Sequence, residues 1–272
     1  MALKQRIALI DADTIVFLVA LEQFKAGNKS IAGNVRGHTH RFIDSILAEA
    51  NSSHYIIFVQ GEDHKNYRKK EYKRYKEHRK SNEAVEHWRA VILDAMKERG
   101  AVILNNLESD DAVSIYANAT RNPYIIISAD KDLNGIQGIH FNPFKRNVTR
   151  DEQWYNVTEE QANLQRWAQI LAGDGTDASL EDTGIANVGM GKPGKPGKAQ
   201  KMLANVPQEL FRAKVAEEYM KKYGVVSGLE RMALTYRVIH ILEAPRADIK
   251  ESSTILTVAP VPYKKAVDDL FN

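Results

Sequence analysis

Short runs rich in isoleucine and valine recur through the first half of the chain, and segments with helical periodicity separate them. The strand-like runs are residues 6–13, 55–60, 101–105 and 124–128, with a further one at 139–144. The helical patterns between them are 36–50, 83–99 and 110–120. Continuous apolar strands that alternate with helices are typical of a parallel sheet covered on both faces. The order therefore predicts a three-layer α/β fold.

The second half of the chain, from about residue 158, lacks clear strands. Its helical patterns are residues 159–172, 198–203, 208–223 and 229–242, and a glycine- and lysine-bearing loop at 173–197 separates the first two. Residues 25–37 are interpreted as a glycine-rich surface loop. We expect an α/β core at 1–155 and a helical region at 156–272. The sequence assigns no role to the tail after Pro245.

Composition excludes several classes of site. The chain has no cysteine, so disulfides, thiolate zinc sites and cysteine nucleophiles are excluded, and any metal must be held by oxygen or histidine ligands. The longest apolar run, residues 15–21, is too short to cross a bilayer. With 43% hydrophobic and 27% charged residues, the composition is typical of a soluble globular protein. We expect a cytoplasmic location.

Carboxylates follow three separate strand-like runs. They are Asp11 and Asp13 at the end of the first run, Glu108, Asp110 and Asp111 after the third, and Asp130 and Asp132 after the fourth. Because the carboxyl ends of parallel strands share one edge of a sheet, these side chains should meet there. Two like charges about 4 Å apart repel by roughly 4 kcal/mol at an effective dielectric constant near 20. The cluster therefore predicts bound Mg²⁺ or Mn²⁺, and its size favours two ions.

Each acidic motif also has a simpler interpretation. Asp13 and Asp110 stand where aspartates often cap the helices that follow them. Another acidic motif, Gly173-Asp174-Gly175-Thr176-Asp177, follows a helical pattern, where it is equally typical of a helix-ending turn.

Residues 64–80, which we call the basic segment, carry nine lysines and arginines against two glutamates, a surplus of seven positive charges. On a helical wheel one stripe holds arginine and tyrosine and the next holds lysine; the two stripes are Arg68, Tyr72, Tyr75 and Arg79, and Lys69, Lys73, Lys76 and Lys80. Cations bind phosphates and tyrosine rings stack on unpaired bases, so the pattern indicates a nucleic-acid partner. The alternative is a solvated helix face.

Residues 188–198 form a second basic motif, VGMGKPGKPGK. Its glycines allow close backbone approach, and its lysines, Lys192, Lys195 and Lys198, suit duplex phosphates. The alternative is a flexible connector.

Together these motifs resemble the 5′-3′ exonuclease and flap endonuclease family, in its compact bacteriophage form and in the 5′ nuclease domain of bacterial DNA polymerase I. The resemblance covers most of residues 5–205. It rests on the strand with Asp11, on YKEHR at 75–79, on the E-x-D-D of 108–111, on the S-x-D-x-D of 128–132 and on GDGTD at 173–177. It implies a PIN-like nuclease core, a helical arch at about 61–83 and a helix–three-turn–helix at about 165–205.

The resemblance also implies roles for individual residues. The first metal site would comprise Asp11, Glu108, Asp110 and Asp111, and the second Asp130, Asp132, Asp174 and Asp177. Lys76 and Arg79 would contact the scissile phosphate, and Tyr75 would stack on a base. The loop at 188–198 would bind duplex DNA and hold a potassium ion. The expected enzyme is a monomeric, divalent-metal-dependent 5′ nuclease acting in phage DNA replication or primer removal, and its partner is DNA with a 5′ end, flap or nick, or an RNA–DNA hybrid.

The chain departs from the family pattern after its second strand, where the family has a phenylalanine–aspartate pair. Here Phe58 is followed by Val59 and Gln60, which leaves Glu62 or Asp63 as substitutes. The loop at 188–198 is also longer than usual.

Two other functions compete with this reading. In a haloacid-dehalogenase-like phosphatase, Asp11 would be the nucleophile and Asp13 the general acid. That class requires its last acidic motif to follow a strand. The other competitor is a protein of the same fold that binds branched DNA without cutting it.

Overall fold

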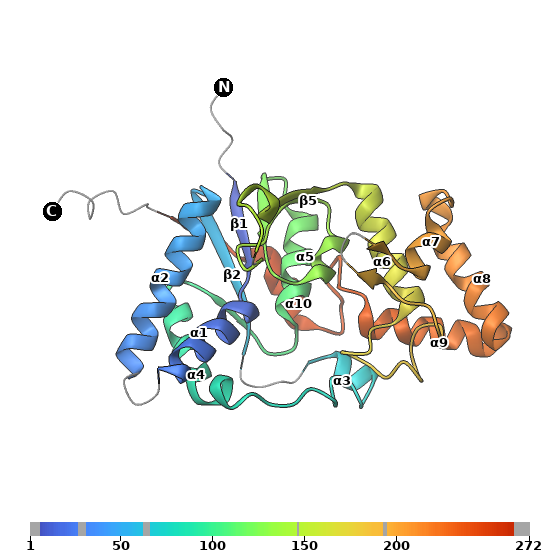
Figure 1. Cartoon of the computed structure of the whole chain (residues 1–272), viewed down its shortest axis with the longest axis horizontal. Helices are drawn as coiled ribbons and strands as arrows, with labels where there is room; N and C mark the ends of the chain where they lie inside the picture. The colour runs from blue at the N-terminus through green and yellow to red at the C-terminus, as the bar shows by residue number, and fades with distance from the viewer. Residues whose placement is uncertain (1–5, 27–30, 62–65, 146, 193–194, 264–272) are drawn as a thin grey trace, which may run out of the picture.

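The computed structural model describes residues 6–26, 31–61, 66–145, 147–192 and 195–263. Its centre is a mostly parallel sheet in the spatial order β3-β2-β1-β4-β5-β6 (Figure 1). The strands are β1 (Ile7–Asp11), β2 (His54–Gln60), β3 (Val102–Leu104), β4 (Tyr124–Ile127), β5 (Gly138–Phe141), β6 (Trp154–Val157) and β9 (Val261–Pro262). β1 to β5 pair in parallel, whereas β6 and β9 run antiparallel to β5 and β2.

Helices cover both faces of the sheet, which confirms the predicted three-layer α/β fold. Ala8 and Ile10 of β1 pack with α1 (Asp13–Lys25), α2 (Ala32–Ala50) and α4 (Glu83–Glu98). Ile7 and Leu9 pack on the opposite side with α5 (Ser109–Ala119). Because both faces are buried, the strands are apolar throughout.

Two helical segments differ from the sequence-based expectation. α1 follows β1 directly. No helix was expected there, since β-branched residues such as those of α1 favour strands. Burial of Ile15, Val16 and Val19 against the core overrides that preference. α2 begins at Ala32, so the loop expected at 25–37 is wrong for residues 32–37.

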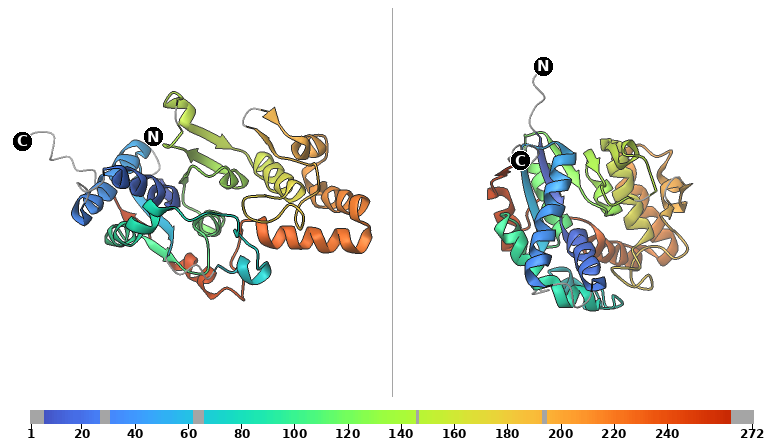
Figure 2. Two further views of the ribbon diagram at one scale, coloured as in Figure 1. Left: turned by 60° about the horizontal axis from the view of Figure 1, so that its bottom comes forward. Right: turned by 60° about the vertical axis from the view of Figure 1, so that its left-hand side comes forward.

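The second half of the chain is largely helical, as expected. Its elements are α6 (Glu159–Ala172), α7 (Lys198–Leu203), α8 (Phe211–Tyr223) and α9 (Val225–Ile239), the hairpin of β7 (Gly191–Lys192) and β8 (Lys195–Pro196), and the 3-10 turn η4 (Gln208–Leu210). The helices enclose their own apolar core. They lie at the opposite end of the molecule from α1, α2 and α4 (Figures 1 and 2). No helix in the described ranges is long and apolar enough to span a bilayer.

The tail after Pro245 returns to the α/β core, although the sequence groups it with the helical region at 156–272. α10 (Lys250–Thr254) packs with the 3-10 turn η5 (Ile255–Thr257), η5 packs beside α5, and β9 pairs with β2. The Glu251 carboxylate accepts the backbone N–H groups of Asn105, Asn106 and Leu107 at 2.7–2.9 Å. These bonds anchor the tail to the loop before α5.

The basic segment, described from residue 66, is helical only in the single turn α3 (Arg68–Glu71). Tyr72 is extended and ends the helix, and a series of turns follows. The continuous amphipathic helix expected from the wheel is therefore wrong for this segment. Tertiary contacts that spacing alone does not reveal hold Arg68 and Tyr75 in the interior, where they are 1% and 2% exposed.

Candidate active site

Carboxylates from three strand ends meet in one open pocket of about 330 Å³. β1 ends at Asp11, β4 leads through Ala129 into the 3-10 turn η2 (Lys131–Gly135), and the residues before α5 reach the same pocket. The sequence-predicted residues that line it are Asp11, Lys76, Arg79, Glu108, Asp110, Asp130, Asp132 and Asp177. The structure thus brings together the strand-end carboxylates and two cations of the basic segment.

Asp11, at the end of β1, is buried and only 4% exposed. It accepts hydrogen bonds from the hydroxyls of Ser109 at 2.5 Å and Ser128 at 2.7 Å. Burial, and then the nearby Asp13 charge, raise the pKa of Asp11 to about 7. A carboxylate whose charge is disfavoured in this way is stabilised by a nearby cation.

The turn after β4 supplies Asp130 and Asp132. Ser128 Oγ accepts the Asp130 N–H, and Asp130 Oδ1 accepts the Asp132 N–H, both at 2.8 Å. Burial and the charges of Asp130 and Asp174 raise the pKa of Asp132 to about 7. Asp132 Oδ1 is buried and has no hydrogen-bond partner among the described residues. Such an orphaned oxygen suits an added cation.

The start of α5 divides its acidic residues between the pocket and the interior. Glu108 faces the pocket, and although burial opposes its charge, Lys76 and Arg68 lower its pKa to about 2. Tyr75 also donates to Glu108 at 2.8 Å. Burial, followed by the charges of Asp111 and Glu108, raises the pKa of Asp110 well above its usual value.

Asp111 does not line the pocket, and its expected role as a metal ligand stays a prediction. It is fully buried, and both of its oxygens accept hydrogen bonds from Arg68. Asp111 Oδ1 also accepts the Leu242 N–H at 2.9 Å. The side chain of Asp111 therefore has a structural task in this arrangement.

The cations of the pocket come from the turns after α3. Lys76 Nζ bonds Glu108 and lies 3.8 Å from Asp177, and Arg79 Nη2 lies 2.8 Å from Asp177. The left-handed backbone of Lys76, with φ 55°, is accompanied by a 2.8 Å hydrogen bond from its N–H to the Asp177 carbonyl. Burial opposes the charge of Lys76, but Glu108 and Asp177 raise its pKa above the usual value, so the ammonium stays charged.

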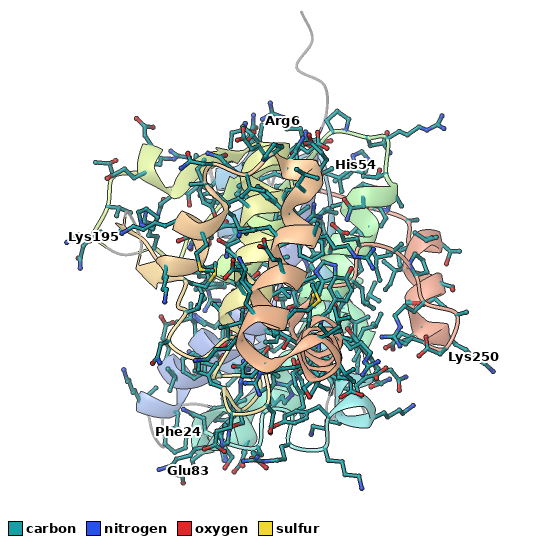
Figure 3. All side chains as sticks on the ribbon, turned by 90° about the vertical axis from the view of Figure 1, so that its right-hand side faces the viewer. Arg6, Phe24, His54, Glu83, Lys195 and Lys250 are labelled. Atoms are coloured by element: carbon teal, nitrogen blue, oxygen red, sulfur yellow. The ribbon has the colours of Figure 1, made fainter. Side chains whose placement is uncertain are left out.

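Other residues expected to bind nucleic acid divide into buried and exposed groups. Arg68 and Tyr75 are buried in this arrangement, and their expected contacts with a phosphate and a base stay predictions. Tyr72 donates to Asp182 at 2.6 Å. The lysines exposed to solvent are Lys69, Lys73, Lys195 and Lys198. Lys195 projects at the edge of the molecule (Figure 3), and Lys192 belongs to the β7–β8 hairpin.

Asp174 lies in an adjacent pocket that it shares with Asp132. Its Oδ1 accepts the N–H and hydroxyl of Thr176 at 2.8 and 2.6 Å. The motif follows helix α6, which ends before Gly173 at φ 70°. The phosphatase reading required a strand at this place, so the structure argues against it.

The donor set fits a hard divalent ion in kind, since all the candidate ligands are oxygens. As the side chains stand, however, no three aspartate, glutamate or histidine side chains of the described residues are grouped where they could hold an ion. Lys76 and Arg79 occupy oxygens of Glu108 and Asp177 instead.

Sequence reasoning did not assign Ser109, Phe17 or Ser128 to the site. Ser109 and Phe17 line the pocket, and Ser128 orients Asp11 from behind. Serine hydroxyls carry no distinctive spacing. Asp13 also lines the pocket; the sequence counted it in the acidic cluster, with a helix cap as the alternative, and placed it in neither metal site. Glu62 and Asp63, the expected substitutes for the missing aspartate, lie outside the described residues.

Comparison with known proteins identifies the family. The family model of the 5′-3′ exonuclease N-terminal resolvase-like domain matches residues 6–163. The fold is similar to two structures from bacteriophage T5: the D15 protein crystallised with metal ions, and the D15 flap endonuclease in a pseudo-enzyme-product complex with DNA and metal ions.

Both similarities are in fold rather than sequence. The first has 11% identity and a TM-score of 0.59, and covers 88% of this chain and 89% of the other. The second has 13% identity and a TM-score of 0.59, with 93% and 98% covered. No curated protein matches by sequence. Because the family model spans more than half of the chain, including the strands that carry the acidic pocket, the chain belongs to the 5′-3′ exonuclease family and is a phosphodiester hydrolase of the 5′ nuclease type.

Proposed function

We propose that this protein is a divalent-metal-dependent, structure-specific nuclease that cuts DNA near a 5′ end, flap or nick, in phage DNA replication or primer removal. One observation carries the proposal: strand-end carboxylates and the cations Lys76 and Arg79 line the same open pocket. An acidic cluster alone would repel DNA. Cations at its rim attract the backbone and contact a phosphate as it reaches the carboxylates.

The carboxylates hold the ions in this proposal. Residues such as Asp11, Asp110, Asp130 and Asp132 would hold Mg²⁺ or Mn²⁺, which would supply positive charge at the phosphate and lower the pKa of a bound water. Ser109 and Ser128 fix the orientation of Asp11 through its two oxygens.

The cations bind the phosphate. Lys76 and Arg79, which pair with Glu108 and Asp177 in this structure, would turn to phosphate oxygens of the bound substrate. Charge-assisted hydrogen bonds of this kind are among the strong ones, and the planar guanidinium of Arg79 suits two phosphate oxygens.

Exposed lysines bind the rest of the substrate. Lys69 and Lys73 lie on the basic segment, and Lys195 and Lys198 lie on the loop at 188–198. In that loop a Cβ on Gly197 would lie 2.2 Å from the Gly189 carbonyl oxygen, which shows how closely the backbone packs. We assign this loop to duplex phosphates and, with its carbonyl oxygens, to the proposed potassium ion.

The test is an end-labelled substrate set comprising a 5′ flap, a nicked duplex and an RNA–DNA hybrid, incubated with Mg²⁺, with Mn²⁺ or with EDTA. We expect cleavage near the 5′ end with either ion and none with EDTA, and product lengths distinguish exonuclease from flap-endonuclease cutting. Tight binding without cleavage in either metal would instead establish the branched-DNA-binding alternative. Release of phosphate from a small monoester, without DNA cleavage, would favour the phosphatase.

A further inference from the structure

We propose that Asp13 is an additional metal-binding residue, which delivers a carboxylate to the end of β2; this inference rests on the proposed function. β2 lies between β1 and β3 in the sheet. The chain after β1, β3 and β4 supplies carboxylates to the pocket, whereas β2 ends in Gln60 and Gly61. Among the described residues, β2 supplies no carboxylate of its own.

The side chain of Asp13 is not used as a helix cap. The N-cap residue of α1 is Ala12, and no side-chain cap hydrogen bond forms at that helix end among the residues that the structure describes. Instead Asp13 Oδ1 accepts the backbone N–H of Gln60 at 3.0 Å. The carboxylate therefore crosses from the start of α1 to the last residue of β2.

The second oxygen of Asp13 faces the carboxylate of Asp11 through one serine. Ser109 Oγ lies 3.0 Å from Asp13 Oδ2 and 2.5 Å from Asp11 Oδ1. A hydroxyl has a single proton, so it can donate to only one of the two oxygens. With both carboxylates charged, the other contact brings together two oxygen atoms without a proton between them. A divalent cation bound by both carboxylates would offset the repulsion between these oxygen atoms.

At Gly61, directly after β2, there is no room for a side chain that could carry a carboxylate into the pocket. A Cβ on Gly61 would lie 2.6 Å from Asn105 Oδ1 and 3.1 Å from the Leu104 carbonyl oxygen. Gly61 also donates its N–H to that carbonyl at 2.6 Å, so the backbone is held in place. A carboxylate can reach this part of the pocket from α1, and Asp13 occupies that position.

The experiment measures Mn²⁺ binding to the DNA-free protein, with the free ion followed by electron paramagnetic resonance. Asp13→Asn keeps the shape and an oxygen for the Gln60 N–H but removes the charge. We expect its Mn²⁺ affinity to be about 10- to 100-fold weaker than that of the wild-type protein. Asp94→Asn is the matched control, because Asp94 is exposed and pairs with Lys97 on α4. Asp13→Ser repeats the test should the asparagine variant fold poorly.

The outcomes separate this inference from the proposed function. If the wild-type protein binds no Mn²⁺, the proposed function itself fails. If the wild-type protein binds Mn²⁺ and both folded Asp13 variants bind it equally well, Asp13 serves only to connect α1 to β2 through its hydrogen bond with Gln60. A loss of affinity in Asp63→Asn or Glu62→Gln but not in Asp13→Asn would also overturn the inference, since the missing carboxylate would then come from residues 62–63.

Discussion

Arg68 and Asp111 form a buried ion pair with two parallel hydrogen bonds, with Nη1 2.6 Å from Oδ2 and Nη2 2.8 Å from Oδ1. Arg68 also donates to the His240 carbonyl at 3.2 Å, and Asp111 accepts the Leu242 N–H. The pair therefore joins the basic segment, α5 and the chain after α9. It fixes the start of α5, and with it the positions of the pocket residues Glu108 and Asp110.

Replacing Arg68 by methionine should destabilise the protein, because Asp111 is left as a buried charge without a partner. We expect the free energy of unfolding to fall by about 3–5 kcal/mol, measured by urea denaturation. The exposed control Lys73→Met should change it by no more than about 0.5 kcal/mol. Adding Asp111→Leu to the Arg68 variant should restore part of the loss. Unchanged stability with weakened DNA binding would instead support the phosphate contact expected from the sequence.

The sheet could be predicted from the sequence, whereas the surroundings of Arg68 could not. The strands were predictable because both faces of the sheet are buried, so residues such as 55–60 form continuous apolar runs. The edge where carboxylates gather followed from the rule that parallel strands end together. The environment of the basic segment was not predictable, because the partner of Arg68 lies 43 residues away and spacing on a helical wheel carries no information about it.

Two further features depend on contacts that leave little trace in the sequence. β9 has only two residues, and the Glu251 carboxylate anchors the tail by accepting backbone N–H groups of residues 105–107. Asp13 occupies a position that suits both a helix cap and a ligand. Only the position of the Gln60 N–H distinguishes the two.

Replacing Lys76 by methionine should separate ion binding from catalysis. The Lys76 ammonium occupies Glu108 and lies near Asp177, so it competes with divalent ions for those oxygens. We expect Lys76→Met to bind Mn²⁺ more tightly while cleavage slows by about 10²–10³-fold, because a positive charge at the phosphate is lost. Binding is measured calorimetrically and cleavage in single-turnover experiments. Weaker Mn²⁺ binding would show that Lys76 does not compete with the ion.

Replacing Asp130 by alanine should abolish cleavage and leave DNA binding intact. Asp130 lines the pocket at the end of β4 and is exposed to solvent, so the fold does not depend on its charge. Removing one negative charge should not weaken attraction of a polyanion. Binding is measured by fluorescence anisotropy with EDTA present, and cleavage with Mg²⁺. Wild-type cutting by the purified variant would remove Asp130 from the metal site.

Acidification should destabilise the protein through His240. Burial, followed by the charges of Arg166 and Arg68, lowers the pKa of His240 from 6.5 to about 3, although Glu243 lies 3.7 Å away. Below pH 6.5 the unfolded chain binds a proton that the folded protein does not, so stability falls as the pH drops from 6.5 towards 3. One such proton corresponds to about 1.4 kcal/mol per pH unit.

The variant His240→Gln isolates this contribution, because glutamine does not titrate. We expect its unfolding free energy, measured in urea between pH 4 and pH 7.5, to depend on pH less steeply than that of the wild-type protein. Equal slopes would mean that His240 is charged in the folded state or that the unfolded chain does not protonate it.

Neutralising Lys195 and Lys198 should weaken binding to duplex DNA and reduce its dependence on salt. Each lysine that contacts a phosphate releases about 0.9 counterion, so the slope of log K against log salt concentration should decrease in magnitude by about 0.9 for each residue. The variants are Lys195→Gln and Lys198→Gln, alone and combined, and binding is measured by anisotropy over a sodium chloride series. Lys250→Gln is the control, because Lys250 is exposed on the opposite edge of the molecule (Figure 3). If all variants share the wild-type slope, the loop at 188–198 is a connector, and duplex phosphates must be bound elsewhere on the protein.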